Sequence, residues 1–246
     1  MRRRALVRLC INGIIMASRR WTGRLRLFGF LTELRFWDRW MRTGGLQWPE
    51  EFAGRMAGKR ELSGPLGEAV ALQPHNPVRV LDVGSGPITS VAPNHPTKQL
   101  VLVPTDALAR GYDLLFLRHR LTPPVRTRPV PAERIAAEFG ATPFHIVHAR
   151  NTLDHMTDPW EVIRQMVAVC APGGLVWLDH EENEGEHANY GGMHGWNFCI
   201  RDGQPEVWSG PRNRRHRIEA SAFDGVSRVE AEQSGNQITI RIFKAG

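Results

Sequence analysis

The alternation of apolar and polar residues predicts a chain of short strands separated by helices. Five apolar runs rich in β-branched residues are bounded by Pro, Gly or polar positions, as buried strands are. Mostly helical stretches separate them, which is typical of a parallel, doubly wound α/β sheet. The five predicted strands are Val78–Val83, Leu100–Val103, Val125–Val130, Phe144–Ala149 and Leu175–Leu178.

Proline and glycine mark where the predicted helices begin and end. Gly44-Gly45 ends a first helix of aromatic residues at helical spacing, and Pro49 begins the next. Pro93 and Pro96 keep the helix after the first strand short. The predicted helices cover residues 30–40, 49–55, 107–117 and 159–169, with a further one opening at Pro131.

Two more pairs of strands are predicted in the last third of the chain. Asp202-Gly203 predicts a hairpin turn between residues 198–200 and 207–208. Residues 226–230 and 238–243 are the predicted terminal strands, joined around Gly235. The pattern as a whole therefore predicts an α/β, Rossmann-like architecture.

The net charge of +7 is spread unevenly. Residues 1–42 hold eleven arginines and two acidic residues, so this stretch carries +9 and the remainder −2. Such a patch suits a nucleic-acid backbone, but no base-stacking pattern accompanies it, so we favour an amphipathic arm and expect no nucleic-acid partner. We divide the chain into a basic, aromatic helical arm or lid (1–70) and a ligand-binding domain (71–246) with a lid insert (180–213).

Cysteine usage and hydropathy indicate where the protein works. The three cysteines are widely spaced and form no metal signature, which indicates a reducing compartment. Arg8 and Asn12 interrupt the apolar stretch near the start, so we expect no secretory signal, and no apolar run reaches the roughly 18 residues of a membrane span. We therefore expect a cytoplasmic protein.

The stretch Val-Leu-Asp-Val-Gly-Ser-Gly-Pro carries the first chemical signal. Gly84 and Gly86 follow the first strand and allow a sharp turn close to a ligand. A dinucleotide site would need a third glycine where Thr89 stands, and Pro87 lacks an N–H donor for a phosphate. The carboxylate of Asp82 would repel a phosphate but suits a cationic or zwitterionic ligand. This chemistry favours an aminoacyl-sulfonium cofactor over NAD.

These residues resemble the first motif of class I S-adenosylmethionine (SAM) dependent methyltransferases. The resemblance runs from Val78 to Leu178 and includes a Pro-Gly-Gly turn at residues 172–174. It implies a seven-stranded, mostly parallel sheet that ends in an antiparallel hairpin, an N-terminal helical lid, and SAM as the cofactor. One position departs from the family, because His145 replaces the Asp of the fourth strand.

Several residues are predicted to bind the cofactor in addition to Asp82, Gly84 and Gly86. Asp106 lies 24 residues after Asp82, near the offset at which an acid meets ribose hydroxyls, although it also suits a helix cap. Glu133 matches the family position near adenine, or complements a helix dipole. Arg55 is a candidate partner of the SAM carboxylate, and Asn151 of the amino group or the nucleophile.

The walls of the pocket are predicted from two aromatic and polar segments. Trp37, Trp40 and Trp48 either form a lid or simply pack on the sheet, and His155 follows the fourth strand. In the insert, Tyr190 and His194 are the candidate general bases, and Trp196 and Asn197 the candidate substrate or lid residues.

A metal site was the remaining possibility in the insert. His180, Glu184 and His187 would share one face if the segment were helical, but so dense a run of acids is more often a solvated face. We therefore predict no metal ligands.

The sequence as a whole predicts a SAM-dependent transferase that methylates a small molecule in specialised metabolism. An alternative is cyclisation of SAM itself to azetidine-2-carboxylate and methylthioadenosine, on a weaker resemblance to the synthases that catalyse it. A non-catalytic SAM-fold partner protein is the second alternative. The oligomeric state is left open.

Overall fold

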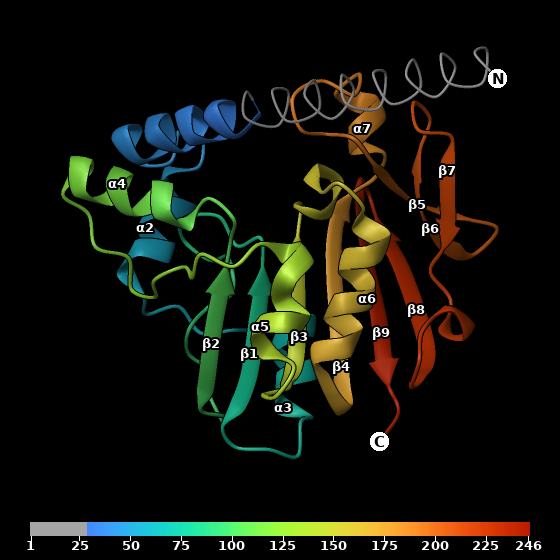
Figure 1. Ribbon diagram of the computed structural model, residues 1–246. Coiled ribbons are helices and arrows are strands. Elements are labelled where there is room, and N and C mark those ends of the chain that lie inside the picture. The colour runs from blue at the N-terminus through green and yellow to red at the C-terminus, as the bar shows by residue number, and fades with distance from the viewer. Residues whose placement is uncertain (1–28) are drawn as a thin grey trace, which may run out of the picture.

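The computed structural model describes residues 29–246, and the predictions for the Arg-rich start of the chain lie largely outside this range. A twisted six-stranded sheet runs through the centre of the described part (Figure 1). Its strand order is β2-β1-β3-β4-β9-β8, with four parallel strands followed by an antiparallel pair. The strands are β1 (Val78–Val83), β2 (Leu100–Thr105), β3 (Phe144–Arg150), β4 (Cys170–Glu181), β8 (Val226–Ser234) and β9 (Gln237–Lys244).

The α/β, Rossmann-like prediction is confirmed, but the strand count is six in the main sheet rather than seven. The predicted strand Val125–Val130 was wrong, because this segment makes a single bridge, between Arg128 and Thr105 of β2. Prolines 123, 124 and 131 flank the segment and Pro129 lies within it, and each lacks the N–H that a ladder needs. Strand β2 is therefore an edge of the sheet.

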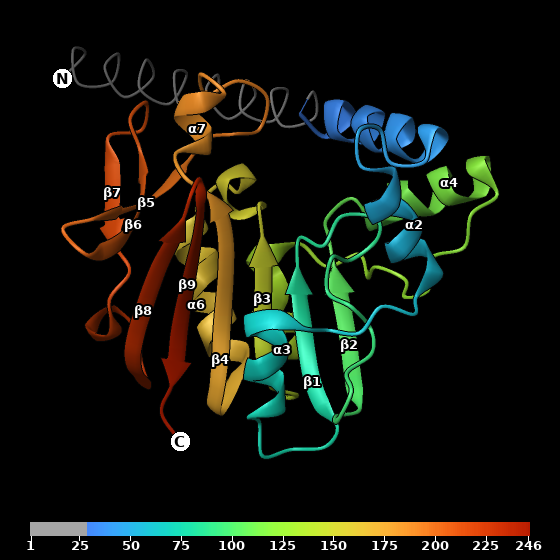
Figure 2. The ribbon, with the colours of Figure 1, turned by 180° about the vertical axis from the view of Figure 1, so that it is seen from behind.

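Helices cover both faces of the sheet. Helices α5 (Ile135–Phe139) and α6 (Pro159–Val169) lie on one face (Figure 1), and α3 (Gly64–Ala71) crosses the other (Figure 2). Helix α6 has the bounds that the sequence predicts: Asp158 accepts hydrogen bonds from the amides of residues 160 and 161, and Pro159 opens the first turn. The buried face of α6 packs against β3 and β4 in the main core.

The connection between β1 and β2 carries no helix. Residues 84–99, all of which the structure describes, form turns and bends, so the short helix predicted there is absent. Prolines 87, 93 and 96 interrupt the segment, and Asn94 pairs instead with Glu61 in an isolated bridge. Val91 and Ala92 of this segment are buried in one apolar cluster with Val78 and Val80 of β1, so the segment covers the sheet without a helix.

Three helices form a cap over the carboxyl ends of the parallel strands. They are the helix of residues 29–43, α2 (Pro49–Ala57) and α4 (Ala109–His119). Asp38 of the first helix pairs with His119 and Arg118 of α4, at 2.9 and 3.2 Å. Gly111 approaches the first helix so closely that a Cβ there would lie 2.6 Å from Leu34. Ion pairs and tight packing thus hold the first helix against α4 within the cap.

A second, three-stranded sheet contributes to the main core from the side of β8. It consists of β5 (Asn197–Arg201), β6 (Gln204–Ser209) and β7 (Arg214–Arg217), in antiparallel order (Figure 1). The predicted hairpin turn at Asp202-Gly203 joins β5 to β6. The short elements η1 (Ala132–Arg134), η2 (Leu153–His155), α7 (Glu184–His187) and η3 (Ala220–Ala222) complete the described chain. Among its helices, none is long and apolar enough to cross a membrane.

Candidate functional site

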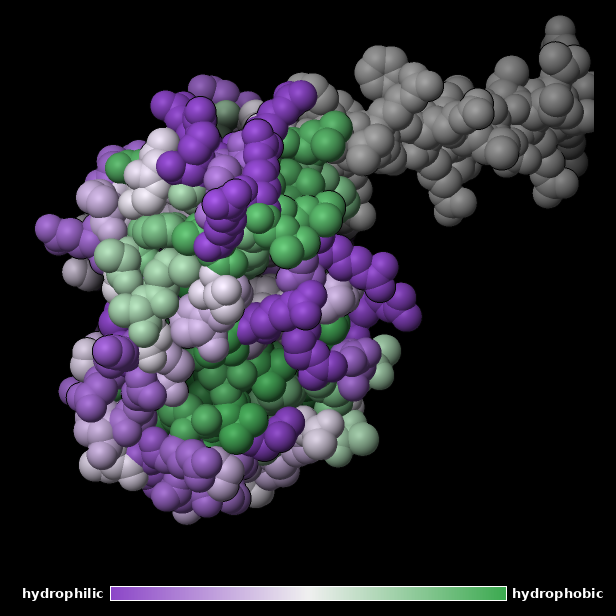
Figure 3. Space-filling model, turned by 90° about the vertical axis from the view of Figure 1, so that its left-hand side faces the viewer, coloured by the Kyte–Doolittle hydropathy of each residue, from purple (hydrophilic) through white to green (hydrophobic). Residues whose placement is uncertain are grey.

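A cavity of about 710 Å³ lies between the cap and the carboxyl ends of β1, β2 and β3. Ligands of open α/β sheets bind at this edge, where the strand order reverses. Figure 3 looks onto the β2 side of the molecule and shows the cap as a distinct upper body above the sheet domain. The predicted residues that line the cavity are Trp37, Trp40, Trp48, Arg55, Asp82, Gly84, Gly86, Asp106, Glu133, Asn151 and His155.

The glycine turn after β1 forms the floor of the cavity. Gly84 and Gly86 both have φ of 66°, a left-handed conformation that other residues adopt only with strain. A Cβ on Gly84 would lie 2.1 Å from Oγ1 of Thr152, and a Cβ on Gly86 would lie 3.1 Å from the ring of Trp37. The turn is therefore packed between the end of β3 and the cap, with room only for glycine.

Asp106 fixes this turn to the start of α4. Its two carboxylate oxygens accept hydrogen bonds from the amides of Gly86 (3.1 Å) and Leu108 (2.8 Å), and the Tyr112 hydroxyl adds a third. Burial raises the pKa of Asp106, and the hydrogen bonds only partly offset this effect. Asp106 thus orders the turn ahead of α4, and it also faces the cavity, as the ribose prediction requires.

A buried ion pair lies directly beneath the turn. Asp82 of β1 accepts hydrogen bonds from His148 Nδ1 of β3 (2.7 Å) and from the Thr89 hydroxyl (2.5 Å). His148 Nε2 faces Asp179 of β4 at 3.7 Å. Burial lowers the pKa of His148, but the two carboxylates outweigh it and raise that pKa to about 9. Burial likewise raises the pKa of Asp179, yet its hydrogen bonds and the His148 charge leave it below the ordinary value.

Sequence reasoning missed His148, although a signal for it was present. Asp82 and His148 occupy paired positions of neighbouring parallel strands, so aligning the two apolar runs would have placed them side by side. Both carboxylate oxygens of Asp82 are engaged within the protein. Asp82 is therefore neutralised by His148 and holds the strand end below the turn, rather than standing as a bare carboxylate.

Aromatic rings make the upper wall of the cavity. Trp37 packs edge-on against Trp40 with 5.3 Å between ring centroids, and it also meets Tyr112 of α4 at 6.3 Å. Trp40 is buried and contacts Phe52 of α2, whereas Trp48 is about half exposed at the rim. The aromatic stripe of the first helix thus both packs the cap and lines the cavity.

Arg55 reaches the cavity from α2. Its guanidinium donates to the Glu51 carboxylate (2.5 Å) and to the Ile88 carbonyl (3.0 Å), while its Nε is buried with no hydrogen-bond partner among the described residues. Burial raises the pKa of Glu51, but the hydrogen bond and the charge of Arg55 bring it below its ordinary value. The unpartnered Nε leaves a donor available for an anionic group of a ligand.

Asn151 ends β3 with a left-handed backbone, at φ of 44°. Its amide N–H donates to the Asp179 carbonyl, and its side-chain oxygen accepts from the amide of Glu181, which ties β3 to β4. Glu181 also lines the cavity and was not predicted. One hydrogen bond thus orients the side chain of Asn151 at the wall where the two strands end.

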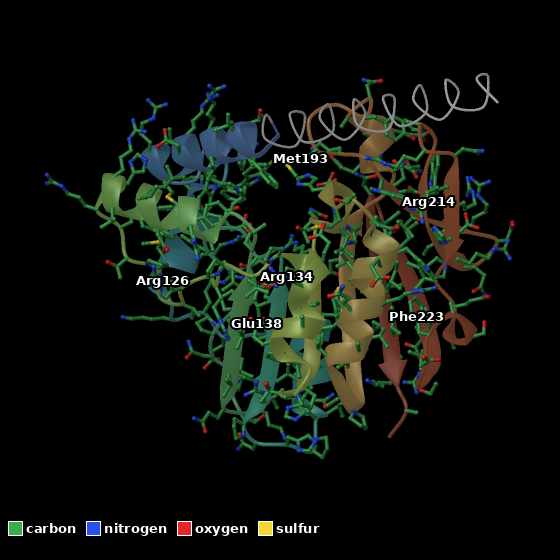
Figure 4. The ribbon with its side chains drawn as sticks, viewed as in Figure 1. Arg126, Arg134, Glu138, Met193, Arg214 and Phe223 are labelled. Carbon is green, nitrogen blue, oxygen red and sulfur yellow. The ribbon has the colours of Figure 1, made fainter. Side chains whose placement is uncertain are left out.

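A cluster of Asp154, His155 and His194 stands beside this wall. His194 Nδ1 lies 2.7 Å from a buried Asp154 oxygen and 3.2 Å from His155 Nε2. The hydrogen bond to Asp154 raises the pKa of His194. Burial raises the pKa of Asp154, but the hydrogen bond and the neighbouring imidazoles leave it lowered. Met193, which directly precedes His194 in the loop, lines the cavity (Figure 4). It lies so close to Gly29 of the cap that a Cβ on this glycine would contact it.

Four predicted residues of the insert do not line the cavity, and His194 of the cluster just described is one of them. Trp196 and Asn197 are fully buried in the main core and beside α7. The Tyr190 hydroxyl accepts hydrogen bonds from Asn197 (3.0 Å) and from the amide of Gly210 (3.3 Å), so it fastens the loop to β6. The apolar bodies of these side chains are used for packing, which places them away from the ligand.

The histidines and acid of the insert do not share a helical face. His180 lies within β4, is fully buried and stacks on Phe198 at 4.0 Å, and burial lowers its pKa to about 4. Glu184 and His187 belong to the four-residue helix α7, which begins only after the strand ends. The segment is not a continuous helix, because β4 extends through Glu181.

The fold and the cavity at the strand ends define a class I, SAM-dependent methyltransferase. Residues 50–217, more than half of the chain, match a family model described as a methyltransferase domain. The chain therefore belongs to the methyltransferase domain family, and SAM is its cofactor.

Two curated relatives are ubiquinone biosynthesis O-methyltransferases. The protein of Caulobacter sp. (strain K31) is 29% identical over 114 residues, which cover 42% of this chain and 40% of the relative. That of Caulobacter vibrioides is 30% identical over 81 residues, or 33% of this chain and 27% of the relative. The chain thus spans less than half the length of either relative.

Two solved structures are also similar. An O-methyltransferase family protein from Burkholderia thailandensis shares 15% identity, with 74% of this chain and 56% of that chain covered and a TM-score of 0.47. The CurJ carbon methyltransferase shares 16% identity, with 71% and 50% covered and a TM-score of 0.46.

The residues present fit SAM. At Gly84 and Gly86 a ligand can approach the backbone closely, in space that a Cβ atom would fill. Arg55 Nε is a buried donor without a partner among the described residues. Acidic residues outnumber arginines on the lining, which suits a sulfonium and an ammonium group. The acids are Glu33, Glu51, Asp82, Asp106, Glu133 and Glu181, against Arg55 and Arg150.

Proposed function

We propose that this protein transfers the methyl group of SAM to a small molecule. The observation that carries the proposal is the cavity itself: its volume of about 710 Å³ falls in the range of small-molecule sites, and the aromatic helix of the cap covers it. A polymer substrate would need an open groove. That the reaction belongs to specialised metabolism stays a prediction.

Bound SAM would supply an activated methyl group, so the protein has to align the acceptor and exclude water. In our proposal, the turn at Gly84 and Gly86 admits the cofactor close to the backbone, and Asp106 receives its ribose hydroxyls. Trp37 and Trp40 close the site to water. Arg55 offers its free Nε to the carboxylate.

The acceptor end of the cavity is proposed to lie near the ends of β3 and β4. The side chain of Asn151 would orient the acceptor there, and the neighbouring Asp154–His155–His194 cluster is placed to favour the loss of its proton. The two curated relatives are O-methyltransferases by name, which favours an oxygen acceptor. A hydroxyl loses its proton as the new C–O bond forms, and SAM leaves as S-adenosylhomocysteine.

Incubation with SAM alone tests this proposal. Calorimetry is expected to show binding, and mass spectrometry is expected to show no methylthioadenosine above the non-enzymatic background. Methylthioadenosine with azetidine-2-carboxylate would instead establish cyclisation, and absence of binding would favour the non-catalytic partner protein. A panel of phenols and other small hydroxyl compounds then identifies the acceptor by its gain of 14 Da.

A matched pair of variants tests the cofactor site. Asp106→Ala is expected to weaken SAM binding at least tenfold, because it frees the glycine turn and removes the ribose acceptor. Asp113→Ala, in the helix α4 that follows Asp106, removes only an ion pair with the exposed Arg126 and is expected to leave binding unchanged. Equal binding by both variants would refute the role of Asp106.

A further inference from the structure

Three metal-ligating atoms converge beside the cavity. They are Asp154 Oδ2, His155 Nε2 and His194 Nδ1, with mutual distances of 2.7, 3.2 and 3.4 Å. Each residue turns one ligand atom toward the same point. Such convergence of two imidazole nitrogens and one carboxylate oxygen is the donor set of three-ligand zinc sites.

The spacing matches a metal ion quantitatively. The point in the plane of the three atoms that is equidistant from them lies about 1.8 Å from each, by geometry from these distances. An ion at the usual Zn–N and Zn–O distance of about 2.0–2.1 Å would therefore sit roughly 1 Å above this plane. Two ligand atoms at this distance from a tetrahedral zinc ion are about 3.3 Å apart. Only His194 Nδ1 and Asp154 Oδ2, at 2.7 Å, would therefore have to move slightly apart.

The fold holds the three residues from two distant segments. Asp154 and His155 belong to η2, directly after β3, while His194 lies in the loop after α7. The amide of Gly195 donates to the Asp154 carbonyl at 2.9 Å, which fixes this loop to η2. Asp154 is 3% exposed, whereas the two imidazoles are partly open. The site is thus anchored on one side and accessible on the other.

A further acid stands within reach of this point. Glu184 Oε1 lies 3.9 Å from His194 Nδ1, so a modest rotation of the Glu184 side chain would bring its oxygen in as the fourth ligand. His155 lines the cavity, so any open coordination position lies next to the bound small molecule.

We propose that Asp154, His155 and His194 form a binding site for a divalent transition metal of N/O preference, with Zn²⁺ as the ion that fits the geometry. This proposal concerns metal binding and does not depend on the proposed methyl transfer. An ion here would offer its open position to an oxygen of the ligand in the cavity and act as a Lewis acid on it.

Zinc titration of the full-length, untagged protein tests the proposal. After treatment with a chelator, the wild-type protein is expected to bind one Zn²⁺ per chain with a rise in Tm. His155→Ala and His194→Ala are expected to weaken this binding at least 100-fold, since each removes a ligand. His187→Ala is the matched control, because His187 is an exposed histidine of the same insert outside the cluster; it is expected to bind zinc as the wild type does.

Two results would overturn the proposal. Equal zinc binding by the wild type and His194→Ala would show adventitious sites only, and absence of binding by the wild type would leave a purely hydrogen-bonded cluster. Anomalous diffraction from zinc-soaked wild-type crystals avoids the question of variant folding. A peak between the three atoms is expected, and a peak elsewhere would refute the site.

Discussion

The buried charge of His148 gives the molecule a stability that depends on pH. The pKa of this imidazole is about 9 in the folded chain, against an ordinary value of 6.5. The folded state holds this proton more tightly than the unfolded state does. The protonated imidazole therefore contributes its full stabilisation below pH 6.5, and this stabilisation is lost as the pH rises to about 9. The difference corresponds to about 3 kcal/mol of unfolding free energy, at about 1.4 kcal/mol per pKa unit.

Urea denaturation of the wild type and of His148→Gln at several pH values measures this contribution. At pH 5.5 the variant is expected to be less stable by about 3 kcal/mol, because Asp82 is left buried without its charged partner. By pH 9.5 the gap is expected to shrink by about the same amount, as the wild-type imidazole loses its proton. Subtracting the variant from the wild type removes the titration of all other groups.

His145→Gln is the control for this experiment. Burial lowers the pKa of His145, so its imidazole is neutral in both folded and unfolded chains above pH 7. The stability gap between wild type and this variant is therefore expected to stay constant between pH 7 and 9.5. A gap for His148→Gln that also stays constant would show that His148 is neutral in the folded protein and would refute the reasoning.

Three further substitutions have expected outcomes. Urea denaturation is expected to show that Gly84→Ala lowers the free energy of unfolding by about 2 kcal/mol or more beyond the loss for Gly173→Ala. Both glycines have positive φ, but only a Cβ at position 84 would clash with Thr152. Equal losses of stability in the two variants would contradict the packing of the turn. Glu206→Gln is expected to lower stability by about 1–3 kcal/mol, since a buried carboxylate faces three arginines, and a shift of Tm below 1 °C would contradict this. Tyr190→Phe is expected to lower Tm with unchanged turnover, whereas lost turnover would support the catalytic role predicted from the sequence.

Local signals sufficed for the parts of the fold that depend on neighbouring residues. Pro159 and the apolar periodicity predicted α6 with its observed bounds, and the glycine turn was placed correctly after β1. The prediction of a strand at residues 125–130 failed because it gave more weight to the β-branched residues than to the prolines within and beside the segment. Backbone donors decide pairing, and proline removes them.

The candidate site was less predictable because its residues meet through long-range contacts. His148 and Asp82 are 66 positions apart, and His194 and Asp154 are 40 apart. The glycine-rich insert was expected to hang over the pocket, but burial of Trp196 and the bond of Tyr190 to Asn197 draw much of it into the core. Within the insert only Glu181 and Met193 line the cavity, which composition alone could not distinguish.

The three-stranded sheet has a consequence for how the molecule unfolds. Trp196, Phe198, Val207 and Ile218 come from this sheet or its flanks, yet they belong to the same apolar core as β3, β4 and α6. The insert is therefore no detachable module: deuterium is expected to replace the amide protons of β5 and β6 only in the global opening that also exposes β4. A loop that shapes the ligand cavity is thus tied to the main apolar core, so variation in its buried residues is limited by the stability of the fold before it is limited by substrate choice.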